Sequence, residues 1–196
     1  MTLPDKLTVS RIGLTFVFMF FLFSSGVIAK SLALLTFLVA SFTDFLDGFI
    51  ARGQNISTDF GKLMDPIADK ILILAAFLSF VELKLVPAWM VVIIMFREIT
   101  ITGLRLFSLT KGKVIPADIG GKQKMVSQVV AILAILAFLI FREAGIKVFD
   151  FWTERTEVVY KDTIFGLMLI TTTLTLISGI GYLVKNRDIY FNAKDH

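Results

Sequence analysis

The sequence predicts an all-α, polytopic membrane protein with six transmembrane helices. Of its 196 residues, 56% are hydrophobic and 18% are charged, whereas a soluble domain is about 45–50% apolar and about 25% charged. The mean hydropathy is +0.82. Too few polar residues remain to cover a water-exposed surface. A soluble enzyme is therefore excluded, and we expect one integral-membrane domain over residues 1–196.

Six apolar stretches have the length that a bilayer requires, roughly 20 residues for a helix. They run over residues 12–29, 31–51, 66–83, 86–106, 124–141 and 163–184. Before Arg11, the residues Pro4 and Asp5 interrupt the apolar character. This favours a short interfacial helix at the membrane surface over a cleavable signal peptide. A short turn around residues 24–26 is expected to join the first two spans.

The distribution of basic residues predicts the orientation. Six spans place both termini on one side, where fourteen of the Lys and Arg residues then lie, against six on the other side. The positive-inside rule makes that side the cytoplasm. Trp89 and Trp152 fall at the opposite interface, where tryptophan is common. The net charge of +4 fits an anionic leaflet or anionic substrates, and no basic stripe with interleaved aromatics points to nucleic acid.

The sequence also limits the chemistry. It contains no cysteine and a single histidine, His196. Disulfides, thiolate zinc sites and cysteine nucleophiles are excluded, and histidine catalysis is not expected. Catalytic groups must therefore be carboxylates, Lys, Arg, hydroxyl side chains or the backbone.

Four aspartates stand at the predicted cytoplasmic ends of the second and third spans: Asp44, Asp47, Asp65 and Asp69. The first two are three residues apart and the last two are four apart, so each pair shares a helix face. Carboxylates at a membrane are costly, and four that converge cannot all stay ionised without compensation. Two divalent cations would compensate them, and oxygen-only ligands suit Mg²⁺ or Mn²⁺.

Small residues and one arginine accompany the aspartates: Gly48, Ala51, Arg52 and Gly61. The small residues leave room for a ligand against the backbone, and a guanidinium suits phosphate. Together they predict a diphosphate site at which two metals stabilise displacement at phosphorus. Two other interpretations stay open, namely simple helix capping and a divalent-cation transporter. Arg52 and the off-centre position of the aspartates argue against transport.

The pattern Asp44-x2-Asp47-Gly48-x2-Ala51-Arg52-x8-Gly61-x3-Asp65-x3-Asp69 resembles the signature of the CDP-alcohol phosphotransferases. Further segments are similar to the phosphatidylglycerophosphate synthase subfamily: Leu3-Pro4-x2-Leu7-Thr8-x2-Arg11, Asp65-Pro66-x-Ala68-Asp69-Lys70, Arg97-Glu98 with Gly103-Leu104-Arg105, and Gly121-Lys122-x-Lys124. Together these segments cover most of residues 3–130, and the last two spans match in hydropathy alone. Asp5 and Met125 depart from the subfamily, which usually carries Asn and commonly Thr there.

The resemblance implies a six-helix homodimeric enzyme of the bacterial inner membrane, with its site open to the cytoplasm. It implies that CDP-diacylglycerol donates a phosphatidyl group to an alcohol and that CMP leaves. By the same resemblance, the four aspartates hold two Mg²⁺ or Mn²⁺ ions, and Asp69 also takes the proton from the attacking hydroxyl. The residues implied to contact the cytidine diphosphate are Thr8, Gly48, Ala51, Arg52 and Gly61.

The favoured acceptor is glycerol 3-phosphate, a dianion that needs a basic pocket. The candidates are basic residues at the cytoplasmic ends of spans four and five: Arg105, Lys122 and Lys124, with Arg97 and Lys62 as weaker choices. Basic residues there also satisfy the positive-inside rule. Glu98 shares a helix face with Arg105, so it can orient an arginine or bridge helices. Inositol phosphate, phosphatidylglycerol and serine stay as alternative acceptors.

Overall fold

The computed structural model describes the backbone of residues 3–54, 59–110, 119–147 and 152–187, and the side chains of residues 9–43, 70–108, 121, 123–146 and 152–187. In this part of the chain, helices are the only regular elements. They are α1 (Leu3–Phe23), α2 (Val27–Gln54), α3 (Asp59–Glu82), α4 (Ala88–Thr110), α5 (Ile119–Lys147) and α6 (Glu154–Lys185). The all-α prediction is confirmed.

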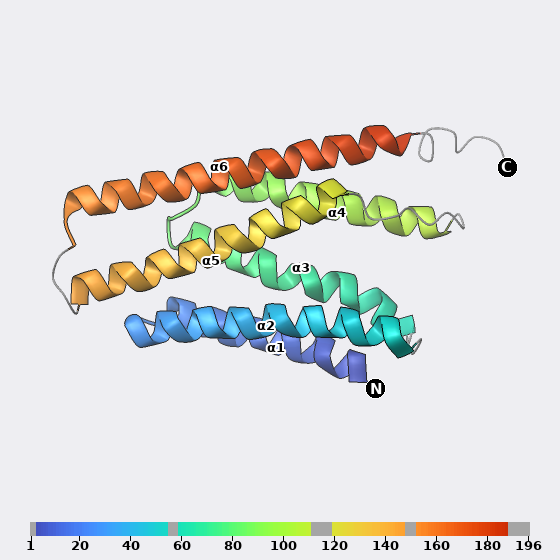
Figure 1. The fold of residues 1–196 in the computed structure, drawn as a ribbon, viewed down its shortest axis with the longest axis horizontal. Coiled ribbons are helices and arrows are strands. Elements are labelled where there is room, and N and C mark those ends of the chain that lie inside the picture. Colours follow the sequence, from blue (N-terminus) through green and yellow to red (C-terminus); the bar gives the residue numbers. More distant parts are fainter. Residues whose placement is uncertain (1–2, 55–58, 111–118, 148–151, 188–196) are drawn as a thin grey trace.

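The helices form a bundle in which the start of α1 and the end of α6 lie on the same side (Figure 1). α1 packs against α2 and α3, and α6 packs against α4 and α5. Contacts of α2 with α5 and of α3 with α4 join the two groups. The C-terminal end of α2 and the N-terminal end of α3 lie toward the side where α1 begins and α6 ends (Figure 1). The aspartate motif is therefore on the side predicted to face the cytoplasm.

Buried phenylalanines hold α1, α2 and α3 together. The rings of Phe18 and Phe37 are fully buried, with centroids 5.7 Å apart. Phe77 and Phe80 of α3 are also fully buried. In a membrane, such side chains hold helices together by close van der Waals packing. This packing joins α2 and α3, the helices that carry the aspartate motif, to α1.

The connection between α1 and α2 lies at residues 24–26, as predicted. Gly26 has a φ of 110°, a conformation that glycine adopts without steric cost. Lys30, in the first turn of α2, donates from Nζ to the carbonyl of Leu22 at 2.5 Å. The predicted boundary between the first two spans, at residue 30, is wrong, because α2 already begins at Val27.

The separate interfacial helix predicted before Arg11 is also wrong, because α1 is continuous from Leu3 to Phe23. Pro4 occupies the first turn, where its missing N–H has no intrahelical partner to lose. Proline therefore starts this helix rather than breaking it. Helices α3, α5 and α6 likewise extend beyond the predicted spans, because the polar residues that flank each apolar stretch are helical too.

The bundle exposes apolar side chains and buries charged ones. Phe16 and Phe96, for example, are 68% and 72% exposed, which suits contact with lipid. In the described part, the helices over Gln123–Ile146 and Glu154–Lys185 are long and apolar enough to cross a membrane. The structure is therefore consistent with membrane association, and the six transmembrane spans stay a prediction.

Candidate active site

The four predicted metal-binding aspartates lie on two helices that are consecutive in the chain. Asp44 and Asp47 belong to the C-terminal part of α2, and Asp65 and Asp69 to the N-terminal part of α3. Each pair lies within a continuous helix, so the two positions of a pair share one helix face. The side chains of these aspartates lie outside the described ones, as do those of Thr8, Gly48, Ala51, Arg52, Gly61, Lys62 and Lys122. The metal site therefore stays a prediction.

A cavity of about 250 Å³ lies among α3, α4, α5 and α6. Lys70, which directly follows Asp69 in α3, is one of its lining residues, so the cavity adjoins the aspartate motif. The other charged residues that line it are Arg97, Glu98, Arg105 and Lys124. Among the described side chains, four cations and one carboxylate give this lining three excess positive charges. A cavity so lined attracts anions.

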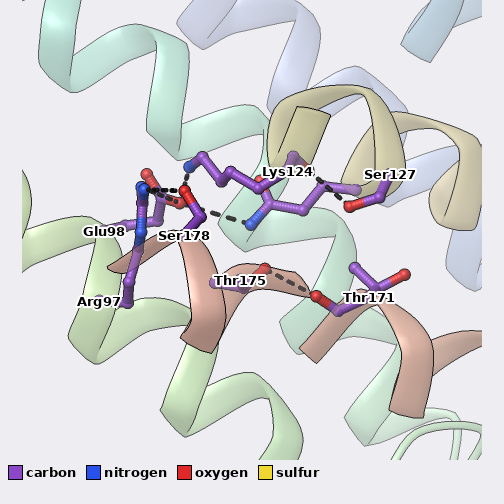
Figure 2. A network of polar contacts seen from close by, with 8 residues as sticks. Arg97, Glu98, Lys124, Ser127, Thr171, Thr175 and Ser178 are labelled. Carbon is purple, nitrogen blue, oxygen red and sulfur yellow. Dashed lines mark hydrogen bonds and ion pairs between the residues drawn. The ribbon is translucent and has the colours of Figure 1, made fainter. Parts of the chain in front are cut away.

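Glu98 is the centre of a buried ionic network (Figure 2). Its Oε1 accepts a hydrogen bond from Nζ of Lys124 on α5. Nη1 of Arg97 and Nε2 of Gln128 each lie 3.4 Å from the same oxygen. All four residues are at most 8% exposed. A carboxylate buried this deeply requires such partners, and the network ties α4 to α5.

Arg97 extends from α4 to α6. Its Nη2 donates to Oγ of Ser178 at 3.0 Å (Figure 2). Its Nε is buried and has no hydrogen-bond partner among the described residues. Arg97 also lines the cavity, and its guanidinium adds a fixed positive charge there.

Arg105 lies over the ring of Tyr182, with Cζ 6.0 Å from the ring centroid, which is within cation–π range. Tyr182 is 3% exposed, and in the described structure its hydroxyl also lacks a hydrogen-bond partner. Leaving such a group unsatisfied costs about 1–3 kcal/mol. Both residues line the cavity.

Comparison with known proteins decides the family. A model described as CDP-alcohol phosphatidyltransferase matches residues 1–139 of this chain. The chain belongs to the CDP-alcohol phosphatidyltransferase family. The recognition made from the aspartate signature is confirmed, and so is the prediction of a transferase.

Three curated relatives show how far the similarity extends. A Bacillus subtilis protein named CDP-diacylglycerol–glycerol-3-phosphate 3-phosphatidyltransferase is 40% identical over 146 residues, which are 68% of this chain and 76% of that protein. A Rickettsia bellii protein of the same name is 32% identical over 181 residues, or 92% of each chain. A Mycobacterium tuberculosis protein named probable phosphatidylglycerophosphate synthase is 41% identical over 133 residues, which are 66% of this chain and 63% of that protein.

Membership of the CDP-alcohol phosphatidyltransferase family bears on the other interpretations. It leaves the cation transporter without support. The prediction of divalent metal ions is consistent with this family, and the identity of the ion stays a prediction. Among the described side chains, no three acidic or histidine residues gather as a metal site. The side chains of the four aspartates lie outside the described ones, and these aspartates remain the proposed ligands.

The structure brings two of the predicted acceptor-binding residues, Arg105 and Lys124, to one cavity. Arg97, a weaker candidate from sequence, lines the same cavity. The bridging role considered for Glu98 is confirmed by its bond to Lys124 on the neighbouring helix. Whether these residues bind the acceptor remains a proposal.

Sequence reasoning missed the contribution of α6. Ser178 and Tyr182 line the cavity, although the sixth span matched the family in hydropathy alone. The available signal was the presence of polar groups near the predicted cytoplasmic end of an apolar span, because such groups tend to face the protein interior. Gln128, which lies within the predicted fifth span, also reaches Glu98.

Proposed function

We propose that this protein transfers the phosphatidyl group of CDP-diacylglycerol to sn-glycerol 3-phosphate, which gives phosphatidylglycerophosphate and CMP. The observation that carries the proposal is the cavity beside the aspartate motif, whose described side chains carry three excess positive charges. A phosphate dianion would neutralise most of that excess. The names of the relatives that cover most of the chain support the same reaction.

The size of the cavity favours a small acceptor. Its volume is about 250 Å³, below the roughly 300–1,000 Å³ of sites for drug-sized ligands. Glycerol 3-phosphate suits such a space better than a second phospholipid headgroup with its chains. Serine carries no net negative charge and would leave the basic lining unexplained. Inositol phosphate is also a small dianion, and it is the acceptor that experiment must separate.

In the proposed reaction, the primary hydroxyl of the acceptor attacks the phosphorus that carries the diacylglycerol. The new phosphorus–oxygen bond forms, the bond to the bridging oxygen of the diphosphate breaks, and CMP leaves. Asp69 takes the hydroxyl proton, because an alcohol is a weak nucleophile at neutral pH without a base. Arg52 offsets the charge that develops on CMP. The cytidine diphosphate lies against Thr8, Gly48, Ala51 and Gly61.

The donor set fits two divalent cations. Four carboxylates on α2 and α3 offer only oxygen ligands, which suits Mg²⁺ or Mn²⁺. Asp44, Asp47, Asp65 and Asp69 would hold them. When bound, the ions supply charge stabilisation for in-line displacement at phosphorus.

We further propose a homodimer in the bacterial inner membrane with this site facing the cytoplasm. The excess of basic residues on the side of the aspartate motif supports the orientation. The resemblance to the family supports the dimer. Labelling of single introduced cysteines in intact cells measures the orientation, since the chain has no cysteine of its own.

The function is tested by measuring CMP release from CDP-diacylglycerol by the purified protein. Glycerol 3-phosphate, inositol phosphate, serine and phosphatidylglycerol are offered separately, with Mg²⁺, with Mn²⁺ or with a chelator. We expect release with glycerol 3-phosphate alone, and none after chelation. Release with another acceptor alone would keep the reaction and overturn the acceptor. No release with any acceptor would overturn the proposed function.

Arg105→Ala is expected to raise the KM for glycerol 3-phosphate by roughly ten-fold or more, because a lost hydrogen bond to a charged group costs about 1.5–3 kcal/mol. The KM for CDP-diacylglycerol is expected to stay nearly constant. Steady-state CMP release, with each substrate varied in turn, measures both values. Arg155→Ala is the matched control, since Arg155 is exposed in the first turn of α6, away from the cavity. An equal effect on both substrates would remove Arg105 from the acceptor site.

A further inference from the structure

We propose that Gly179 of α6 is a positioning residue for acceptor binding, because its lack of a side chain lets Arg97 reach the cavity wall. The inference rests on the proposed function. It adds a residue that acts through Arg97 and not through contact with the substrate. The carrying observation is the close approach of Arg97 to the backbone of α6 at Gly179.

The fit between these two residues leaves no space for a methyl group. A Cβ on Gly179 would lie 2.8 Å from Cγ of Arg97 and 3.5 Å from its Nε. Carbon atoms in contact normally stay about 3.5–4.0 Å apart. Cγ is close to the root of the arginine side chain, so turning the guanidinium alone does not relieve the overlap. The whole side chain of Arg97, or α6 itself, must move.

The other described glycines of α6 lack such a neighbour. In the described structure, nothing lies within 4 Å of a Cβ built on Gly166 or Gly181. A glycine within a helix is less favourable than alanine. At Gly179 the close passage of Arg97 offsets that cost, whereas nothing comparable does so at Gly181, two residues further along.

The consequence of moving Arg97 reaches the cavity. The residue next to Gly179, Ser178, accepts the hydrogen bond from Nη2 of Arg97 at 3.0 Å. Nη1 faces Glu98, which also holds Lys124. A displaced Arg97 loses its contacts with Ser178 and Glu98. Because Glu98 also binds Lys124, the position of the Lys124 ammonium changes as well. Two of the four cations around the cavity are thereby affected.

The test compares Gly179→Ala with Gly181→Ala by CMP release. We expect Gly179→Ala to raise the KM for glycerol 3-phosphate on the order of ten-fold, as misplacement of a binding group does, with little change in the KM for CDP-diacylglycerol. Gly181→Ala should behave as the wild type. An inactive wild type would overturn the proposed function, whereas an active wild type with equal KM values for the two variants would overturn this inference alone.

A double-mutant cycle shows whether Gly179 acts through Arg97. In the Arg97→Ala background the overlap is gone, so adding Gly179→Ala should leave the KM for glycerol 3-phosphate unchanged and should not lower the unfolding temperature, since alanine is the better helix former. The same pair keeps the inference testable if Gly179→Ala alone does not fold, because the double variant should then fold. A further rise in KM, or a further loss of stability, in the Arg97→Ala background would show that Gly179 acts through helix packing.

Discussion

Asp69→Asn is expected to reduce kcat by roughly 10²–10⁴-fold, the range that general acid–base catalysis contributes. Asparagine has nearly the shape of aspartate, but its amide cannot take the proton of the acceptor hydroxyl near neutral pH. The proposed contacts to cytidine diphosphate, from Arg52 and the small residues around it, stay in place. CDP-diacylglycerol should therefore still bind. CMP release measures the first effect, and titration of the purified variant with CDP-diacylglycerol measures the second.

Asp69 is also a proposed metal ligand, so its two roles must be separated. Asp44→Asn removes a ligand without removing the base, and added Mn²⁺ should partly restore its activity. Asp69→Asn should stay inactive at the same Mn²⁺ concentrations. Asp162→Asn is the control, because Asp162 is exposed on α6 outside the cavity. Near-normal CMP release by Asp69→Asn would show that another group takes the proton.

The common helix face of each aspartate pair could be predicted from sequence because it depends on local geometry alone. Within one helix, spacings of three and four residues place side chains on a common face. Asp44 and Asp47 therefore needed no tertiary information, and neither did the recognition of the family. The turn at residues 24–26 was likewise readable from its small residues. The boundary of the first span was not, because the residues on both sides of the turn are apolar.

The α6 wall of the cavity could not be predicted, because it depends on how α6 is rotated about its axis. In a membrane both the buried and the lipid-facing sides of a helix are apolar, so hydropathy does not specify that rotation. Ile177 and Ile180 are exposed, whereas Gly179, which lies between them, and Tyr182, two residues after Ile180, are buried. Only packing against α4 reveals which side meets Arg97. Lys124 is a related case, since a residue consistent with the positive-inside rule turns out to be buried against Glu98.

Glu98→Gln is expected to destabilise the protein by about 3–5 kcal/mol, because removing one partner of a buried ion pair leaves an uncompensated charge. Lys124 and Arg97 both lose the carboxylate that they contact. The amide keeps the shape of the side chain, so the loss reports charge rather than packing. Thermal unfolding of the purified protein measures it. Glu82→Gln is the control, because Glu82 is exposed at the end of α3.

Removing Lys124 together with Glu98 separates stability from binding. In Glu98→Gln/Lys124→Met the buried ion pair is gone, and Arg97 keeps its bond to Ser178. Much of the lost stability should return, since replacing both partners of a buried pair is often nearly neutral. The KM for glycerol 3-phosphate should nevertheless be higher than that of the wild type, because the net charge of the lining is unchanged but Lys124, a proposed contact of the acceptor phosphate, has been lost. If the stability returned and the KM equalled that of the wild type, Lys124 would serve only to neutralise Glu98, and the acceptor phosphate would depend on the other cations of the lining.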